Sequence, residues 1–502
     1  MEVLHHLSAG FEVALTPINI LYCWVGALLG TVVGVIPGLG PVTTIAMLLP
    51  ITFKMPAVSS LIMLSGIYYG AHHAGATGAV MLNMPGDPTA IVVCLDGHPM
   101  AKKGRAGPAL AATAFASFFA GCVSILVLAV LTPPLTQLAL HFQSAEYAAT
   151  IVLALVSVSV ISSALPVTTV SMAVLGLLLG SIGTDLDSGV ERLTMGLPNL
   201  SDGINIIALV VGLFAFAQII PYLTHKLPPQ MAPSKITGLL PNRDEWRRMW
   251  RPILRGTGLG SILGIFPGTG PLIASFAAYT MERYIAKDPS RFGHGAIEGV
   301  AGPEAANNAS AMTHFIPMLT LGIPAGPAMA LLLAALMIQG VSPGPEFIHQ
   351  HATLFWGVIA SMWIGNFMLL FLNLPLIGLW VRLLTIPYRY LYPFVLFSCC
   401  VGIYAINNQA ADVIMAAIIG LFGVLFRWIH CPPEPLVLGF ILEPVLEDNF
   451  RRAMLIARGD PLIFIERPVS LFILLLSLGL LVLFSLPSAR RRVSRAAHVT
   501  EG

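Results

Sequence analysis

Charged residues are scarce in this sequence. Lys and Arg number 26 and Asp and Glu 24 among 502 residues, so charged side chains make up 10% of the chain, whereas soluble domains carry about 25%. Hydrophobic residues reach 56% and the mean hydropathy is +0.83. Apolar runs of about 20 residues recur, without the alternation typical of outer-membrane barrels. The composition excludes a soluble globular protein and predicts an all-α integral membrane protein.

Motifs of common enzymes and metal sites are also missing. The six cysteines show no Cys-x-x-Cys spacing and are interpreted as small hydrophobic residues. His72 and His73 would point about 100° apart on a helix, and no His-x-x-x-His pair exists. There is no Gly-x-Ser-x-Gly elbow or phosphate-binding loop, and Gly38-Leu-Gly40 lacks the context of a dinucleotide site. We expect no metal, no organic cofactor, no ATP hydrolysis and no nucleic-acid partner.

A stretch rich in glycine and proline occurs twice. Residues 26–41 read GALLGTVVGVIPGLGP, and residues 256–271 read GTGLGSILGIFPGTGP. An offset of 230 residues aligns five glycines and two prolines of the two copies without a gap. The match indicates an internal duplication.

Each copy brings an apolar helical run to Pro-Gly-x-Gly-Pro. This sequence interrupts a helix, because proline lacks an amide donor and glycine frees the backbone. An interruption within the bilayer exposes peptide groups, which must be buried in protein or line a wet cavity. Paired interruptions in two halves are typical of a transporter's binding site. Since half-helix N-termini favour negative charge, the expected ligand is an anion such as a carboxylate.

A second proline-bounded break follows in each copy. Residues 82–88 (LNMPGDP) align with residues 321–327 (LGIPAGP) at an offset of 239 residues. The duplication therefore covers a whole unit. The halves differ in polar residues: Asn83 and Asp87 have no polar counterparts, while the second break is preceded by Glu304, Asn307, Asn308, Ser310, Thr313 and His314.

The predicted architecture is two pseudo-symmetric repeats with broken or re-entrant helices and about ten to twelve transmembrane segments. Apart from the broken segments near residues 26–50, spans are expected at about 57–69, 108–132, 145–165, 166–182, 203–223, 252–266, 271–285, 326–339, 351–376, 391–406, 410–427 and 470–487. The predicted divisions are an N-terminal repeat at 1–224, a basic linker at 225–255, a C-terminal repeat at 256–487 and a basic tail at 488–502.

The distribution of Lys and Arg predicts the orientation. The segment from Lys102 to Arg105, the 225–255 linker and the 488–502 tail are basic and should be cytoplasmic. The part of the second half that matches Lys102–Arg105 is residues 340–346, which contain no Lys or Arg. Equivalent loops on opposite sides favour an inverted repeat.

The predicted site combines backbone at the breaks with nearby polar side chains. Asp87, buried in a broken helix, would bind a coupling cation, Na⁺ or H⁺, with Asn83 and Gly326, and its alternative role is a helix cap. Each polar side chain could instead bond between helices. The predicted substrate-binding residues are Pro37, Gly38, Gly40, Thr43, Thr44, Asn83, Pro267, Gly268, Gly270, Asn307, Asn308, Ser310 and Thr313.

These motifs together resemble a known family. The segments are 34–41 (GVIPGLGP), 69–78 (YGAHHAGATG), 83–88 (NMPGDP), 96–101 (DGHPMA), 264–271 (GIFPGTGP) and 321–325 (LGIPA). In this order they resemble the large membrane subunit of the tripartite tricarboxylate transporters, over roughly residues 15–485. One departure is Tyr69-Gly70-Ala71, where the family often has Tyr-Gly-Gly.

The resemblance implies a multi-pass permease of the bacterial inner membrane. It implies secondary transport of citrate-like di- or tricarboxylates, driven by an ion gradient. It also implies two partners, a small membrane subunit and a periplasmic substrate-binding protein. The residues leave two alternatives open: a membrane-embedded enzyme that uses His72, His73 and Asp87, or a passive anion channel.

Overall fold

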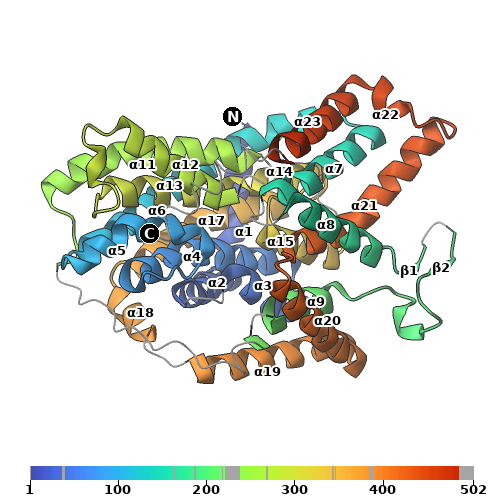
Figure 1. Cartoon of the computed structure of the whole chain (residues 1–502), viewed down its shortest axis with the longest axis horizontal. Coiled ribbons are helices and arrows are strands. Elements are labelled where there is room, and N and C mark those ends of the chain that lie inside the picture. Colours follow the sequence, from blue (N-terminus) through green and yellow to red (C-terminus); the bar gives the residue numbers. More distant parts are fainter. Residues whose placement is uncertain are drawn as a thin grey trace.

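The structure is a computed structural model that is almost entirely helical (Figure 1). Pro37, Gly38, Pro267 and Gly268 fall outside the residues that it describes. The described residues are 2–36, 40–161, 165–185, 188–217, 219–220, 238–266, 270–341, 344, 346–384 and 388–485.

The first half contains helices and one short hairpin. The strands β1 (Gly183–Thr184) and β2 (Glu191–Arg192) pair antiparallel. The helices are α1 (Glu2–Ala14), α2 (Pro17–Val35), α3 (Gly40–Thr52), α4 (Ala57–Leu82), η1 (Pro88–Ala90), α5 (Ile91–Lys102), α6 (Ala106–Ala139), α7 (Ser144–Ile161), α8 (Pro166–Gly180), η2 (Pro198–Leu200), α9 (Ile206–Val210) and the π-helix η3 (Val211–Phe216).

The described part of the second half is entirely helical or irregular. Its helices are α11 (Arg243–Ile265), α12 (Gly270–Ile285), η4 (Pro289–Arg291), α13 (Glu298–Thr313), α14 (Phe315–Leu321), α15 (Pro327–Ile338), α16 (Phe347–Gln350), α17 (Ala352–Asn373), α18 (Ile377–Leu383), α19 (Tyr388–Asn407), α20 (Ala410–Trp428), α21 (Glu434–Ile456), α22 (Ile463–Glu466) and α23 (Pro468–Ser485).

Among the described residues, four helices are long and apolar enough to cross a membrane: α2, α6, α17 and α20. Shorter apolar helices accompany them, including α3, α8, α15 and α23. The predicted all-α membrane class is confirmed. The expected number of ten to twelve spans stays a prediction, because many apolar helices are shorter than the roughly 20 residues that a perpendicular span needs.

Two predicted segment ends differ from the observed helices, while the division into two repeats, a linker and a tail stays a prediction. The helix expected at 57–69 continues to Leu82, since small residues alone do not end a helix. The basic segment after Arg243 and the span expected at 252–266 form one helix, α11, so the linker boundary predicted at 255 falls inside it. Asn242 and Glu245 form a capping box at the start of α11, which fixes where the helix begins.

Glycines bring α2 against α4 and α11 against α13 in the same way. A Cβ added at Gly26, Gly30 or Gly34 would lie 2.2–2.5 Å from a carbonyl oxygen of α4. A Cβ added at the aligned glycines of α11 would lie 2.2–2.5 Å from a carbonyl oxygen of α13. Each pair of contacted residues differs by 239 positions: Met63 and Gly302, Ile67 and Ala306, Ala71 and Ser310. The two helix pairs therefore share one packing geometry.

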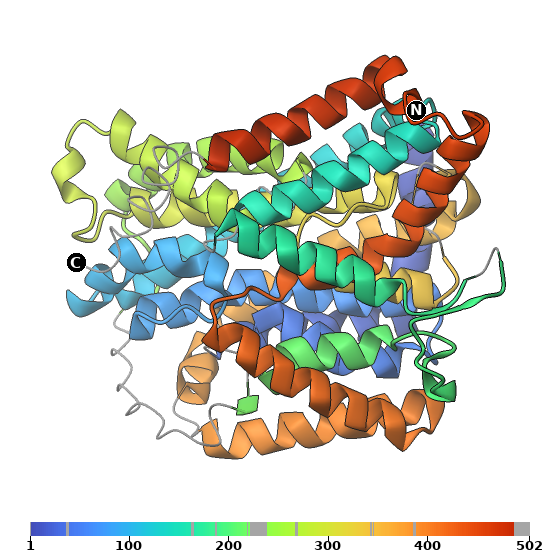
Figure 2. The same ribbon diagram turned by 45° about the vertical axis from the view of Figure 1, so that its right-hand side comes forward.

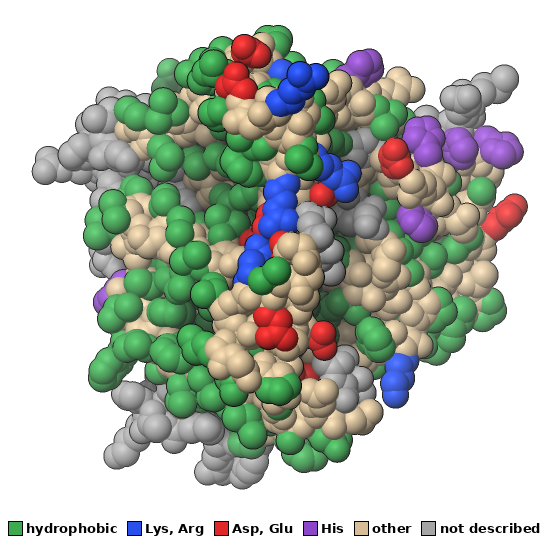
Figure 3. Space-filling view, turned by 90° about the vertical axis from the view of Figure 1, so that its right-hand side faces the viewer, with side chains coloured by type: hydrophobic (Ala, Val, Ile, Leu, Met, Phe, Trp, Pro, Cys, Tyr) green, Lys and Arg blue, Asp and Glu red, His purple; other side chains and the backbone are tan. Residues whose placement is uncertain are grey.

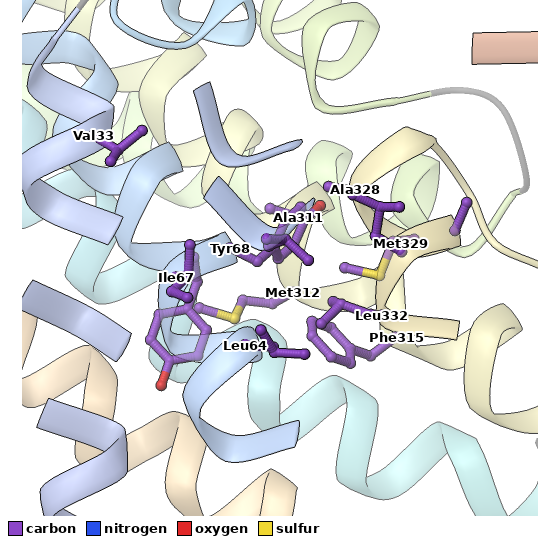
Figure 4. Close-up of a cluster of buried hydrophobic side chains, with 14 of the residues drawn as sticks. Val33, Leu64, Ile67, Tyr68, Ala311, Met312, Phe315, Ala328, Met329 and Leu332 are labelled. Atoms are coloured by element: carbon purple, nitrogen blue, oxygen red, sulfur yellow. The ribbon is translucent and has the colours of Figure 1, made fainter. Parts of the chain in front are cut away.

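Apolar side chains from both halves meet in the core (Figure 4). Leu64, Ile67 and Tyr68 of α4 lie in one cluster with Met312 of α13 and Phe315 of α14. Each of these side chains is at most 4% exposed. Close packing of these side chains holds the halves together through van der Waals contacts, because lipid tails are as apolar as the side chains and leave no hydrophobic gain between helices.

The hairpin is anchored to α21 by ion pairs. Arg192 of β2 pairs with Glu447 at 2.7 Å, and Arg451 pairs with Asp185 at 3.1 Å. Figure 3 shows Lys, Arg, Asp and Glu side chains gathered in a column on the face that carries the hairpin. Figure 2 shows α7, α8, α21 and α23 side by side, and these helices contact one another.

Asp96 of α5 ties the first half to the start of α13. Its Oδ1 accepts hydrogen bonds from the backbone N–H groups of Gly295 (2.7 Å) and Ala296 (2.8 Å), and its Oδ2 accepts one from the Tyr279 hydroxyl (3.0 Å). Asp96→Ala should lower the free energy of unfolding by about 3 kcal/mol, because buried N–H groups lose a charged acceptor.

Thermal unfolding in detergent measures this loss. Tyr279→Phe is the matched control, since it removes a single hydrogen bond to Asp96 and should cost about 1 kcal/mol. Asp96→Asn keeps an acceptor oxygen and should fall between the two variants. Equal losses for all three variants would contradict the role given to Asp96.

Candidate functional site

Helices end and restart at matching places in the two halves. α2 ends at Val35 and α3 begins at Gly40, while α11 ends at Ile265 and α12 begins at Gly270. The predicted residues Pro37, Gly38, Pro267 and Gly268 lie between these ends, outside the described residues.

Gly40 and Gly270 share one unusual conformation. Each has φ of +61°, in the left-handed region that favours glycine. A Cβ at either position would meet no described atom within 4 Å. Each glycine therefore combines a backbone that requires glycine with open space beside it, which suits the approach of a ligand to the peptide groups.

The second breaks also match. Asn83 ends α4 with φ 58° and ψ 26°, and Gly322 ends α14 with φ 69° and ψ 21°. Their N–H groups donate to the carbonyls of Gly78 and Pro317, which again differ by 239 positions. The Asn83 side chain is exposed. Asn83 therefore serves the turn through its backbone, since asparagine tolerates the left-handed region.

The two breaks of the first half lie side by side. A Cβ at Gly86 would approach the carbonyl oxygen of Gly34 to 1.6 Å, so the 83–87 turn rests on the end of α2. In the second half, Gly264 at the end of α11 packs on Ser310 and Thr313, which precede the break at Gly322 by twelve and nine residues. Gly326, predicted beside Asp87 for the cation, has an extended backbone with φ 179°.

Asp87 is buried and has two neighbours. Its Oδ1 accepts hydrogen bonds from the Thr89 N–H (2.8 Å) and hydroxyl (2.6 Å), which caps η1. Its Oδ2 lies 3.9 Å from Nδ1 of His72, and that nitrogen also lies 3.0 Å from the Tyr68 carbonyl. The capping alternative is thus present, and the second oxygen faces a titratable ring.

Side chains on α13 form a polar network with α6. Ser117 of α6 donates to Glu304 Oε1 at 2.8 Å, and Asn308 Nδ2 donates to the same oxygen at 2.9 Å and to Ser117 at 2.8 Å. All three residues are at most 2% exposed. The network links the first half to the second.

Buried polar atoms remain without a hydrogen-bond partner among the described residues. They include both amide atoms of Asn307, Ser310 Oγ, Glu304 Oε2 and the Nε2 atoms of His73 and His314. An unsatisfied buried polar group costs about 1–3 kcal/mol of stability. The presence of several such groups therefore indicates a place for a ligand, ion or water. Tyr68 reaches His314 at 3.3 Å and connects the halves here.

The predicted hydroxyl residues bond locally. Thr44 donates to the Gly40 carbonyl at 3.1 Å, and Thr313 donates to the Ala309 carbonyl at 3.0 Å. Thr43 is 3% exposed, next to the start of α3. These residues line the breaks, but Thr44 and Thr313 already use their hydroxyl protons within their own helices.

Glu304 and Ser117 were absent from the predicted site. One signal could have found Glu304: it is the sole acidic residue between 299 and 345, and an ionisable residue within a membrane segment is functional by default. No sequence signal marks Ser117, because its partner is 187 positions away.

Comparison with known proteins decides the family. The profile of the tripartite tricarboxylate transporter TctA family matches residues 20–438, most of the chain. The chain belongs to the TctA family. The suspected resemblance is therefore confirmed, and the helix breaks described above lie within the matched region.

Two relatives of this TctA-family protein come from Agrobacterium vitis. An uncharacterised 52.8 kDa protein in the TAR-I ttuC' 3' region is 51% identical over 493 residues, 98% of both chains. An uncharacterised protein in the TAR-II ttuC' 3' region is 53% identical over 233 residues, 46% of this chain and 96% of the relative. No solved structure matches. As a member of a transporter family, the protein is a transporter subunit of the membrane.

Proposed function

We propose that this protein is the permease subunit of an ion-gradient-driven importer of citrate-like di- or tricarboxylates. It would lie in the bacterial inner membrane with a small membrane subunit and receive substrate from a periplasmic binding protein. Membership of the TctA family supports the class of substrate and the tripartite assembly. A cation, Na⁺ or H⁺, would couple the gradient to transport.

One observation carries the proposal: two pairs of helix interruptions lie at matching positions, and buried polar atoms near them have no partner within the described ranges. Peptide N–H groups at Gly40 and Gly270 would meet substrate carboxylates, since half-helix N-termini favour negative charge. Asn307 and Ser310, whose side-chain polar atoms have no partner among the described residues, would add donors, while the amide of Asn308 is already used on Glu304 and Ser117. The glycine contacts of the first half recur in the second half at residues 239 positions later. This recurrence supports two pseudo-symmetric repeats, which we propose are inverted.

Ion pairs support the proposed orientation. With Lys102–Arg105 in the cytoplasm, successive crossings place the α6–α7 turn, the hairpin and the α22 region together outside. Arg467 at the start of α23 pairs with Glu146 of α7 at 3.1 Å. The hairpin is likewise paired with the end of α21. These contacts join segments that the orientation puts on one side.

Reconstitution of the complex with its two partners in liposomes tests the proposal. A carrier accumulates labelled carboxylate in a saturable manner that depends on an ion gradient. A passive anion channel lets carboxylate equilibrate without accumulation, and a membrane enzyme releases product without uptake. Either of these two results would overturn the proposed function.

Asp87→Asn separates capping from coupling. The amide oxygen of asparagine can still cap η1, so the protein should fold, whereas the charge beside His72 is lost. We expect uptake to lose its dependence on the coupling ion. The measurement is carboxylate accumulation under imposed Na⁺ and H⁺ gradients, and unchanged dependence on both would refute the assignment.

A further inference from the structure

Glu304 is a carboxylate within the core that has no basic partner among the described residues. It is 0% exposed, on the face of α13 that meets α6. Its Oε1 accepts hydrogen bonds from Ser117 and Asn308. Its Oε2 has no hydrogen bond, and Glu304 makes no ion pair, within the part of the chain that the structure describes. One oxygen is thus held by donors and the other is free.

An ionised carboxylate in this position is costly. The free-energy cost of removing a charge from water is offset only when a cation or several hydrogen-bond donors contact the charged group. In Glu304, two neutral donors contact one of the two carboxylate oxygens. A proton on Oε2 removes the charge and leaves Oε1 as a carbonyl-type acceptor for the Ser117 and Asn308 donors. The observed hydrogen bonds fit the protonated side chain as well as the ionised one, so proton gain and loss require no rearrangement of these partners.

Charged groups around Glu304 come from several elements. Arg255 of α11 is already paired with Glu282 of α12 (2.7 Å), and α6 carries no charged residue between Ala106 and Ala139. On the side of the first half, Asp87 caps η1, and η1 packs against α13. Further titratable groups on packed elements include His72 and His73 of α4 and His314, which follows α13. Asp96 and His98 of α5 belong to the same set, and Asp96 lies more than a turn away near Gly299.

We propose that Glu304 binds the coupling proton on Oε2, while Ser117 and Asn308 hold Oε1 in both states. A proton arriving from outside would convert the carboxylate to the acid, and its release to the cytoplasm would restore the carboxylate. Because Ser117 lies on α6 and Glu304 on α13, the proton acts where the two halves touch. This inference rests on the proposed function and names its coupling ion.

Glu304→Gln tests the proposal in liposomes that contain the assembled transporter. Labelled citrate, succinate and malate are the probes, and two assays are compared: exchange at equal pH, and accumulation driven by an inward proton gradient. The variant should keep exchange within about twofold and lose accumulation, because glutamine is neutral but does not release a proton. Glu298→Gln, on the same helix and paired at the surface with Arg291, is the control and should behave as wild type.

Ser117→Ala provides a second test with little change in volume. Losing one donor to the ionised form should move the pH of half-maximal transport upward by about one unit. A merely structural role would lower the rate without moving this pH.

Three results would overturn the proposal: proton-driven accumulation by Glu304→Gln with wild-type pH dependence, accumulation driven by Na⁺ alone, or an unmoved pH midpoint in Ser117→Ala. If wild type neither exchanges nor accumulates any probe, the proposed function itself fails. Infrared difference spectra then still test Glu304, since a protonated carboxyl signal should titrate in wild type and Glu298→Gln and be absent from Glu304→Gln.

Discussion

Gly260→Leu should prevent α11 from packing on α13 and abolish the folded protein. A Cβ at position 260 would lie 2.3 Å from the carbonyl oxygen of Ala306, and backbone atoms have no room to move aside in a packed helix pair. The helices must separate, which removes the neighbouring contacts of Gly256 and Gly264 as well. The free energy of unfolding should fall by about 3 kcal/mol or more. This loss is larger than usual for overpacking, because the added side chain clashes with backbone atoms.

Gly258→Leu is the matched control, two residues away on the same helix. A Cβ there meets no described atom within 4 Å, and leucine favours helix over glycine by about 1 kcal/mol. This variant should therefore be at least as stable as wild type. The yield of folded protein, measured by size-exclusion chromatography, and the midpoint of thermal unfolding would distinguish Gly258→Leu from Gly260→Leu.

The same experiment applies to the first half, where a Cβ added at Gly30 would lie 2.5 Å from the carbonyl oxygen of Ile67. Gly30→Leu should fail as Gly260→Leu does. Tolerance of leucine at both positions would show that the equivalent packing of the two helix pairs is not what holds them together.

Gly40→Asn should leave the protein folded and reduce transport by at least about tenfold. Asparagine tolerates the left-handed conformation of Gly40, so the helix break survives. Its side chain, however, would occupy the open space beside the start of α3. If a carboxylate binds to peptide groups there, the side chain blocks its approach and the substrate is misplaced.

Carboxylate uptake by the reconstituted complex, compared with folded yield, measures this effect. Gly104→Asn is the control, because Gly104 has φ of +76° and open space around it but lies in the turn between α5 and α6. Gly270→Asn should resemble Gly40→Asn, since Gly270 is its counterpart in the second half. Wild-type uptake by both break variants would mean that substrate does not use this space.

The helix breaks were readable from the sequence because local chemistry makes them. Proline and glycine in five residues stop a helix wherever it lies, and the ends at Val35 and Ile265 follow directly. The structure shows that Asn83 ends α4 with a left-handed backbone and an exposed side chain, and its role as a ligand stays a prediction. Local sequence shows that a polar residue adjoins a break but does not show which way it faces.

The sequence by itself determined that the chain is a helical membrane protein of duplicated design. Composition, glycine spacing and paired breaks are properties of consecutive residues. Only the tertiary structure showed that Ser117 meets Glu304, that Tyr68 meets His314, and that the 83–87 turn rests on α2. Those contacts join residues up to 246 positions apart, and packing alone decides which distant helix faces meet.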